Sequence, residues 1–343
     1  MRLTDRQKLI LTLIIHEHIQ TAQPVGSKTL VQKYHLSMSS ATVRNEMVTL
    51  TDYNLLRQPY TSAGRVPSEE GYRYFVGNLI HNSTLPTTTR RTITHQFYQS
   101  RQDVEQWLKL AASVLANQSQ AASLVTAPHA EKAIFKHLEL IATRGRQVLM
   151  VLVLMGGEIR QQFISLAEPV PQDRLSEIAT KLSNMCVRCD AEGIARLRGH
   201  FDALGQDILD ILMAEMTLIE ESATGQIYLD GMNNVLSEPE FSESDDARQA
   251  LHLLEESSLL ENLLARTVMN TDVGGIQVLI GGEGTWEQLR QCSVVLARYG
   301  DPNSLTGSIG VLGPIRMPYD RTISTVRFVT NVLSDLVSET LAV

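Results

Sequence analysis

The chain has 343 residues, of which 43% are hydrophobic and 20% are charged, a composition that predicts about two or three globular domains and excludes disordered and collagen-like proteins. The formal net charge of −8 at first argues against nucleic acid, because binding to phosphates needs positive charge. No apolar run approaches the roughly 18 residues that span a bilayer, and the N-terminus does not resemble a signal peptide, so we expect a cytoplasmic protein.

The charge is unevenly distributed along the chain. Residues 1–80 contain nine Lys and Arg against six Asp and Glu, a net charge of +3, whereas residues 81–343 contain 21 against 32, a net charge of −11. Such an asymmetry is typical of a protein whose basic end contacts nucleic acid. Because +3 also fits an ordinary protein surface, motifs in this segment must decide between the two interpretations.

The N-terminal segment begins with two predicted helices. The first covers residues 3–19, with Thr4 as a candidate N-cap. Pro24 and Gly26 then break the chain, and a short second helix follows that ends near His35. The residues that recur near helical spacing in the first helix are Leu3, Leu9, Ile10, Leu13, Ile14 and His18.

A third helix begins at Ser39 or Ser40, either of which can cap it. Val43, Met47 and Leu50 recur at i, i+4 and i+7 and form an inward-facing stripe, which leaves the opposite face free. Two helices joined by a short turn, the second with a free face, are typical of a helix-turn-helix, which places its second helix in the major groove of DNA.

The residues after the third helix predict a wing. Residues 55–59 can pair as a strand, residues 61–67 are small and turn-rich, and residues 70–76 form an aromatic helix. Five aromatic residues of this region could stack on single-stranded nucleic acid, but core packing is the favoured interpretation because no OB-fold or RNP signature is present. They are Tyr53, Tyr60, Tyr72, Tyr74 and Phe75.

Several polar residues lie where a winged helix-turn-helix would contact DNA. Arg44 can donate two parallel hydrogen bonds to guanine and Asn45 can pair with adenine, whereas Ser and Thr hydroxyls suit phosphates. Arg65 lies at the tip of the glycine-containing turn, from which it could enter a narrow minor groove. The same residues would also suit a solvated helix face and an exposed loop. The candidate DNA-binding residues are Lys28, Thr29, Ser39, Ser40, Thr42, Arg44, Asn45, Ser62 and Arg65.

A polar stretch at residues 77–91 predicts a linker and a domain boundary. One long helix is then predicted over residues 92–118, in which apolar residues form a narrow seam. The seam could contact a second copy of the chain or pack on the chain's own downstream domain, and the sequence favours neither.

Strands are predicted in two separate parts of the chain. Residues 134–166 predict an antiparallel meander of strands, and comparable strands return at residues 275–315 before a closing helix over residues 321–341. We expect these strands to belong to one sheet, which a mainly helical subdomain at residues 171–268 interrupts.

Motifs that would indicate an enzyme or a metal site are missing or incomplete in the sequence. VGSKT at residues 25–29 lacks the order of a phosphate-binding P-loop, and no GxSxG nucleophile elbow occurs. Asp245 and Asp246 are interpreted as a solvated helix start rather than a carboxylate pair. Cys186 and Cys189 form a lone CxxC, which favours two ordinary thiols over zinc. We therefore expect no catalytic activity, cofactor or metal.

Several segments carry a family resemblance. SSATVRNEM at residues 39–47 and QPYTSAGRVPSEEGYRYFV at residues 58–76 resemble the HrcA family of bacterial heat-inducible transcription repressors. The resemblance continues at GMNNVLSEPEF, residues 231–241, and returns in CSVVLARYG and SIGVLGPIRMPYDR, between residues 292 and 321. Residues 116–133 depart from it, because they are richer in Ala, Ser and Gln than the family pattern.

The resemblance implies an α+β fold with three parts: a winged helix-turn-helix, a GAF-like α/β domain with an antiparallel sheet, and an inserted, mainly helical dimerisation subdomain. The implied DNA-binding domain covers residues 1–76, and a linker and long helix cover residues 77–118. The GAF-like domain is expected to comprise residues 119–170 and 269–343, with the insert at residues 171–268.

The resemblance also implies a function. Such repressors bind, as homodimers, the inverted-repeat CIRCE operator upstream of chaperone operons, are released on heat stress, and depend on the chaperonin GroEL. By matching position, the base-reading helix falls on residues 39–47 and the wing on residues 61–67. The implied partners are thus double-stranded DNA, a second copy of the chain and GroEL, with no role for a membrane.

Two other functions stay open. The GAF-like domain could bind a small-molecule effector, because that fold often contains a ligand cavity, and a ligand of the folded state would raise the unfolding temperature. A DNA-binding enzyme is the other interpretation, against which the missing catalytic motifs speak.

Overall fold

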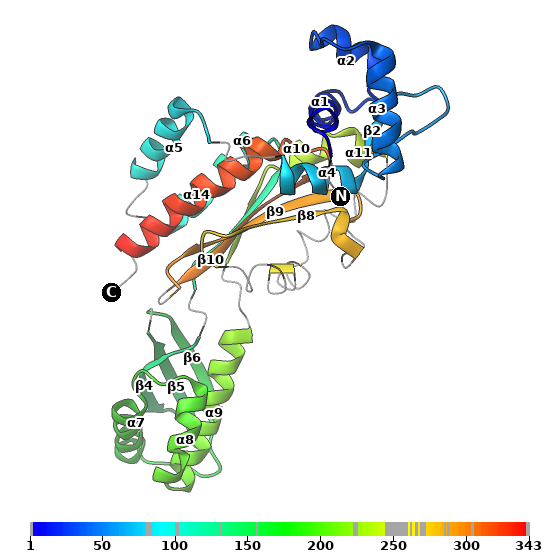
Figure 1. The fold of residues 1–343 in the computed structure, drawn as a ribbon. Helices are drawn as coiled ribbons and strands as arrows, with labels where there is room; N and C mark the ends of the chain where they lie inside the picture. The colour runs from blue at the N-terminus through cyan, green and yellow to red at the C-terminus, as the bar shows by residue number, and fades with distance from the viewer. Residues whose placement is uncertain are drawn as a thin grey trace. The chain divides into compact units, whose positions relative to one another are not determined.

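The computed structural model has an α+β fold, with helices and antiparallel sheets (Figure 1). The described residues are 3–79, 84–99, 103–129, 132–155, 157–221, 226–243, 260, 263–264, 267, 272–284, 286, 289–302 and 305–340. The chain divides into two compact units. Unit 1 comprises Met1–Thr126, Ile227–Tyr299 and Ser308–Leu333, and unit 2 comprises Ala127–Gln226, Gly300–Gly307 and Ser334–Val343.

Three helices form the start of unit 1. They are α1 (Asp5–Thr21), α2 (Ser27–Lys33) and α3 (Ser40–Asp52). Thr4 caps α1 as predicted: its hydroxyl accepts a hydrogen bond from the Gln7 amide, and the Gln7 side chain accepts one from the Thr4 amide. The buried face is rotated from the expected one, because Leu9 is 44% exposed whereas Leu11 and Ile15 are buried.

The third helix begins and packs as predicted. Ser39 is its N-cap, and the Ser39 hydroxyl accepts a hydrogen bond from the Thr42 amide at 3.1 Å. Val43, Met47 and Leu50 are buried, because this stripe of α3 packs against α1 and α2. The opposite face of α3 stays exposed.

A two-stranded antiparallel ribbon follows α3, and a helix closes the segment. The elements are β1 (Leu56–Arg57), β2 (Val66–Pro67) and α4 (Glu69–Asn78). Backbone hydrogen bonds of 2.8 and 2.9 Å between Val25 and Arg65 fix the base of the ribbon to the connection between α1 and α2. Gly64 is required here, because a Cβ at this position would lie 2.3 Å from the Val25 carbonyl oxygen.

Five strands form the sheet of unit 1, in the order β7-β3-β10-β9-β8. They are β3 (Ala122–Thr126), β7 (Ile227–Asp230), β8 (Ile276–Ile280), β9 (Cys292–Gly300) and β10 (Thr306–Pro314). Every residue of β9 and β10 is buried, which is typical of central strands covered on both faces. β3 and β7 were not predicted from the sequence.

The predicted long helix over residues 92–118 is two helices. The helices of this part of unit 1 are α5 (Thr87–Gln99), α6 (Val104–Ser119), α10 (Met232–Leu236), α11 (Pro239–Glu243) and α14 (Tyr319–Thr340), with a 3-10 segment η2 (Gly281–Gly284). Asp103 starts a new helix, because its carboxylate accepts a hydrogen bond from the Gln106 amide at 3.2 Å. The apolar face of α6 packs on β3 and β7, so this part of the seam packs within the chain's own unit.

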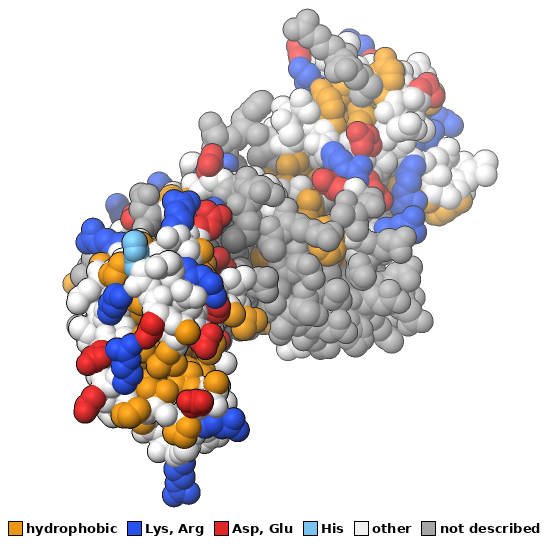
Figure 2. Space-filling model, turned by 90° about the horizontal axis from the view of Figure 1, so that it is seen from below, with side chains coloured by type: hydrophobic (Ala, Val, Ile, Leu, Met, Phe, Trp, Pro, Cys, Tyr) orange, Lys and Arg blue, Asp and Glu red, His pale blue; other side chains and the backbone are white. Residues whose placement is uncertain are grey.

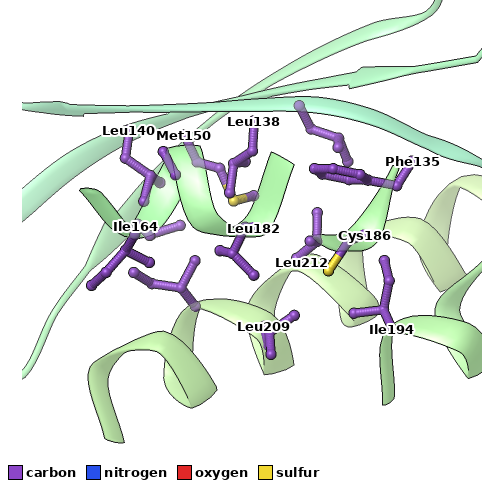
Figure 3. Packing of buried hydrophobic residues seen from close by; sticks show 14 of the residues in the cluster. Phe135, Leu138, Leu140, Met150, Ile164, Leu182, Cys186, Ile194, Leu209 and Leu212 are labelled. Atoms are coloured by element: carbon purple, nitrogen blue, oxygen red, sulfur yellow. The ribbon is translucent and has the colours of Figure 1, made fainter. Parts of the chain in front are cut away.

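Unit 2 contains a separate three-stranded sheet covered by helices on one face. The elements are β4 (Phe135–Ala142), β5 (Gln147–Leu154), β6 (Ile159–Ser165), α7 (Gln172–Cys186), α8 (Ala191–Leu197), a 3-10 turn η1 (Arg198–His200) and α9 (Ala203–Glu221). The strands form the predicted antiparallel meander. Figure 3 shows Leu138, Leu140 and Met150 of the strands facing Leu182 and Leu209 of the helices in one buried cluster.

The expectation of one interrupted sheet is wrong. β4, β5 and β6 form a sheet of their own. The segment between β3 and β7, residues 127–226, forms the main part of unit 2, whereas an insert over residues 171–268 was expected. Each strand of the meander forms its hydrogen bonds with the next strand along the chain, and the composition of a strand does not specify pairing with a more distant one.

Asp245 and Asp246 lie outside the described residues. Within the described ranges, no helix is long and apolar enough to cross a membrane.

Candidate nucleic-acid interface

The exposed face of α3 carries the two residues best suited to contact bases. Arg44 and Asn45 are both exposed. Within the described part of the chain, neither side chain has a hydrogen-bond or ion-pair partner. A guanidinium offers several N–H donors, and a carboxamide offers both a donor and an acceptor. Both side chains are therefore available to a ligand without breaking a contact of the protein.

The hydroxyls at the start of α3 are partly used by the helix itself. The Ser39 hydroxyl caps the helix, and it also shares a hydrogen bond of 3.0 Å with the Thr42 hydroxyl. Ser40 is half-buried in the first turn. The first amides of a helix carry partial positive charge and attract phosphate. We infer that Ser39 and Thr42 contribute to this site mainly by shaping the helix start.

Two candidate DNA-binding residues, Lys28 and Thr29, lie on α2, and both are exposed. Among the described residues, Lys28 has no ion-pair partner. Lys33 on the same helix differs, because its ammonium lies 2.6 Å from the buried Glu17 carboxylate. This hydrogen bond raises the pKa of Lys33. Lys33 thus holds α2 on α1, whereas Lys28 is free to reach a phosphate.

The structure places Arg65 elsewhere than the tip of the wing. Its backbone pairs with Val25 at the base of the ribbon, and its Nε donates a hydrogen bond to the Thr51 hydroxyl of α3 at 3.1 Å. Arg65 is half-buried as a result. The sequence prediction placed Arg65 at the tip of the turn. The ribbon is shorter than expected, so Arg65 lies directly before β2. In this position Arg65 joins the wing to α3.

The loop between β1 and β2, where the wing was expected, is polar and exposed. Tyr60, Thr61 and Ser62 are all exposed, and the Gln58 amide shapes the loop by donating hydrogen bonds to the carbonyls of Thr61, at 2.9 Å, and Ala63, at 3.2 Å. Figure 2 shows a projecting, mostly uncharged loop with Lys and Arg side chains beside it. The sequence pointed to Ser62 but missed the structural role of Gln58.

The aromatic residues do not share one role. Tyr72 and Phe75 are core residues, each 2% exposed, as predicted. Tyr53 and Tyr60 are 42% and 62% exposed, so the core interpretation is wrong for them. Tyr53 follows α3 as its C-cap, and Tyr60 lies beyond the end of β1. Tyr60 therefore belongs to the exposed loop between β1 and β2.

The cysteines of unit 2 lie in and beside its core. Cys186 is fully buried at the end of α7, and Cys189 is half-buried. Burial, together with a smaller effect of the neighbouring Cys189, raises the pKa of the Cys186 thiol to about 11. Cys186 therefore stays a protonated thiol at neutral pH and contributes to packing.

Comparison with known proteins gives consistent matches over the whole chain. A family model described as the HrcA protein C-terminal domain matches residues 105–323. The heat-inducible transcription repressor HrcA of Roseiflexus castenholzii is 43% identical, with 98% of this chain and 95% of that protein covered. The repressors of the same name from Herpetosiphon aurantiacus and Dehalococcoides mccartyi are 41% and 33% identical, covering 99% and 98% of this chain and 96% of each of those proteins.

A solved structure also resembles this chain. The crystal structure of a hypothetical protein superposes with a TM-score of 0.59 at 24% identity, covering 98% of both chains, which shows a shared fold. The named relatives make this chain a heat-inducible transcriptional repressor, a class of protein whose partner is DNA. It belongs to the HrcA family.

Proposed function

We propose that the chain represses chaperone operons by binding, as a homodimer, to an inverted-repeat operator of the CIRCE type. Residues 1–76 act as a winged helix-turn-helix, in which α3 enters the major groove and the β1–β2 ribbon contacts the DNA backbone. The observation that carries this proposal is the exposed pair Arg44 and Asn45, which has no partner among the described residues. Arg recognises guanine and Asn recognises adenine by paired hydrogen bonds.

A single DNA-binding module of this kind binds weakly. The net charge of +3 over residues 1–80 supports few phosphate contacts, and phosphate contacts supply most of the affinity for DNA. Two modules held in one dimer bind far more tightly, because the second contact becomes almost intramolecular. The two-fold symmetry of a dimer is matched by an inverted repeat in the operator.

We propose the open face of the β4–β5–β6 sheet as the dimer surface. Helices cover the other face, yet the open face carries Ile141, Ile159 and Phe163, whose exposed fractions are 44%, 58% and 66%. The strand register places Ile141, Leu149 and Phe163 in one row across the sheet. Contiguous exposed apolar residues of this kind are typical of a protein interface. A second copy of the same face would cover them.

Regulation takes place in the cytoplasm and depends on the other parts of the chain. The five-stranded sheet with α6 and α14 acts as the GAF-like domain, which joins the DNA-binding module to the dimer. Repression then depends on the folded dimer, because a dimer's stability is linked to the concentration of folded protomers. Heat lowers that concentration and releases the operator. A chaperonin such as GroEL restores it when its unfolded clients have been cleared.

The proposal is tested by titrating the purified protein against a CIRCE duplex and a scrambled duplex at physiological salt. The wild type should bind the inverted repeat selectively. Arg44→Ala should weaken this binding by about 1 to 3 kcal/mol, because it removes a paired hydrogen bond to one base. Arg91→Ala is the matched control, since Arg91 is an exposed arginine on α5. Equal, weak binding of the folded wild type to both duplexes would contradict the proposed function.

A further inference from the structure

Arg316, between β10 and α14, joins three separate parts of unit 1. Its side chain is only 11% exposed. It forms ion pairs with Glu238 and with Glu240, the latter at 3.1 Å between Nη2 and Oε2. Its Nη1 donates a hydrogen bond of 3.2 Å to the carbonyl oxygen of Ile19 in α1. One guanidinium therefore connects the sheet, the α10–α11 region and the first helix of the DNA-binding module.

The bond to Ile19 uses a feature of helix ends. The last carbonyls of a helix have no amide partner within the helix, and they carry partial negative charge. Ile19 lies in the last turn of α1, which ends at Thr21. Arg316 therefore supplies both the missing donor and a favourable charge at this end of α1.

Arg73 makes the same arrangement in the opposite direction. It lies on α4 of the DNA-binding module, where it forms ion pairs with Glu69 at 3.1 Å and Glu70 at 2.9 Å. Its Nη2 donates a hydrogen bond of 2.9 Å to the carbonyl oxygen of Ile280 at the end of β8. Its Nε also lies 4.0 Å from a carboxylate oxygen of Glu283, next to β8. Each arginine thus pairs with two carboxylates on its own side and donates a hydrogen bond to a main-chain carbonyl on the other side. We call Arg73 and Arg316 the arginine clamp.

An aromatic contact lies between the two arms of the clamp. The Tyr72 hydroxyl is 2.8 Å from Nδ1 of His18, within the DNA-binding module. On the other side, the Tyr72 ring contacts the ring of Tyr319 at the start of α14, with 5.9 Å between centroids. Both tyrosine rings are buried. The hydrogen bonds of the clamp have defined directions, so they select one orientation for these packed surfaces.

We propose that Arg73 and Arg316 are positioning residues, which fix the DNA-binding module on the sheet domain and thereby set the distance between the two α3 helices of a dimer. This inference rests on the proposed function. Without the clamp, each module still reads its half-site, but the two modules no longer favour one spacing. Arginine is suited to this role, because its planar guanidinium can donate hydrogen bonds to several acceptors at once in a fixed geometry. A lysine ammonium holds its acceptors less rigidly.

The test compares three duplexes in a binding titration with the full-length protein. They are the complete inverted repeat, the same repeat with a changed spacer, and a single half-site. Changing the spacer by about two base pairs rotates one half-site relative to the other by roughly 70°. For Arg316→Met we expect unchanged half-site affinity within about twofold and a loss of about tenfold on the complete repeat. The preference for the original spacer should shrink, and Arg316→Lys should restore part of it.

Two further variants keep the test decisive. Arg73→Met removes the more exposed arm of the clamp and leaves the Arg316 ion pairs intact. It therefore tests the same proposal if Arg316→Met does not fold. Arg321→Met is the control, because Arg321 is an exposed arginine at the start of α14, five residues after Arg316, and its guanidinium contacts Gln118 instead of the DNA-binding module. If wild type prefers one spacer and folded Arg316→Met or Arg73→Met keeps both that preference and full affinity, the clamp is overturned and the proposed function stands. If wild type binds none of the duplexes selectively, the proposed function fails, and the inference fails with it.

Discussion

The two sheets of this repressor have similar apolar sequences but are covered to different extents. β9 and β10 are buried at every position, and Gly310 in β10 leaves room for Leu296, since a Cβ there would lie 2.6 Å from a Leu296 methyl. In β5, only alternate residues are fully buried, although nearly every residue is apolar. Exposed apolar patches are typical of interaction surfaces, and for this reason we proposed that a second copy of the chain covers the open face of β5.

The largest effect is expected from a charged residue introduced on the open face of the β4–β5–β6 sheet. Phe163→Lys should convert the dimer to a monomer and reduce operator affinity by about 1,000-fold, because the two modules lose their link. Sedimentation and a DNA titration measure the two effects. Tyr98→Lys is the control, since Tyr98 is 71% exposed on α5. A dimer that survives Phe163→Lys would show that the open face is not the interface.

A substitution in the covered sheet should act on stability instead. Leu296→Ala removes a fully buried side chain from β9, and we expect it to lower the free energy of unfolding by about 3 kcal/mol. Below its new unfolding temperature the variant should still dimerise and bind DNA normally. Calorimetry and sedimentation of the same sample check both statements. Dissociation of the folded variant would mean that the covered sheet also holds the dimer.

Acid should weaken unit 1 through His18. Burial, together with the positive charges of Arg316 and Arg57 and against the opposing charge of Glu240, lowers the pKa of His18 to about 4. The unfolded chain takes up the proton near the ordinary value of 6.5, so stability is lost as the pH falls from 6.5 toward 4. At pH 5 the loss relative to pH 8 should be about 2 kcal/mol.

The matched variant for this prediction is His18→Gln, which keeps a polar side chain near Tyr72 but does not titrate. Its stability between pH 8 and pH 5 should change less than that of wild type, as measured by chemical denaturation. His95→Gln is the control, because His95 is exposed on α5. Identical pH profiles for wild type and His18→Gln would exclude His18 as the source of the acid sensitivity.

Local signals predicted the N-terminal helices well. The cap at Ser39 and the stripe of Val43, Met47 and Leu50 depend on residues a few positions apart, and the structure reproduces both. The break before α6 could also have been found, because Asp103 with Gln106 three residues later is a typical helix start. The position of Arg65 could not, since it depends on a backbone contact with Val25, 40 residues earlier.

Long-range pairing is where sequence reasoning failed. β3 and β7 are short, and they pair across about 100 intervening residues, so no turn signal connects them. The meander of β4, β5 and β6 was predicted correctly because its strands are neighbours in the chain. Its assignment to the other sheet was wrong because local patterns do not specify which sheet a strand joins. The clamp arginines were missed for the same reason, as their acceptors lie far along the chain.

The pairing of β3 with β7 gives unit 2 a simple relation to the chain. Thr126, the last residue of β3, lies opposite Ile227, the first residue of β7. Topologically, residues 127–226 are therefore a hairpin loop that has been enlarged into a folded unit. Because the entropy of closing a loop grows only slowly with its length, such an insertion needs no rearrangement of the strands that flank it. Residues 127–226 thus add an exposed apolar surface at a point where the sheet itself needs only a turn.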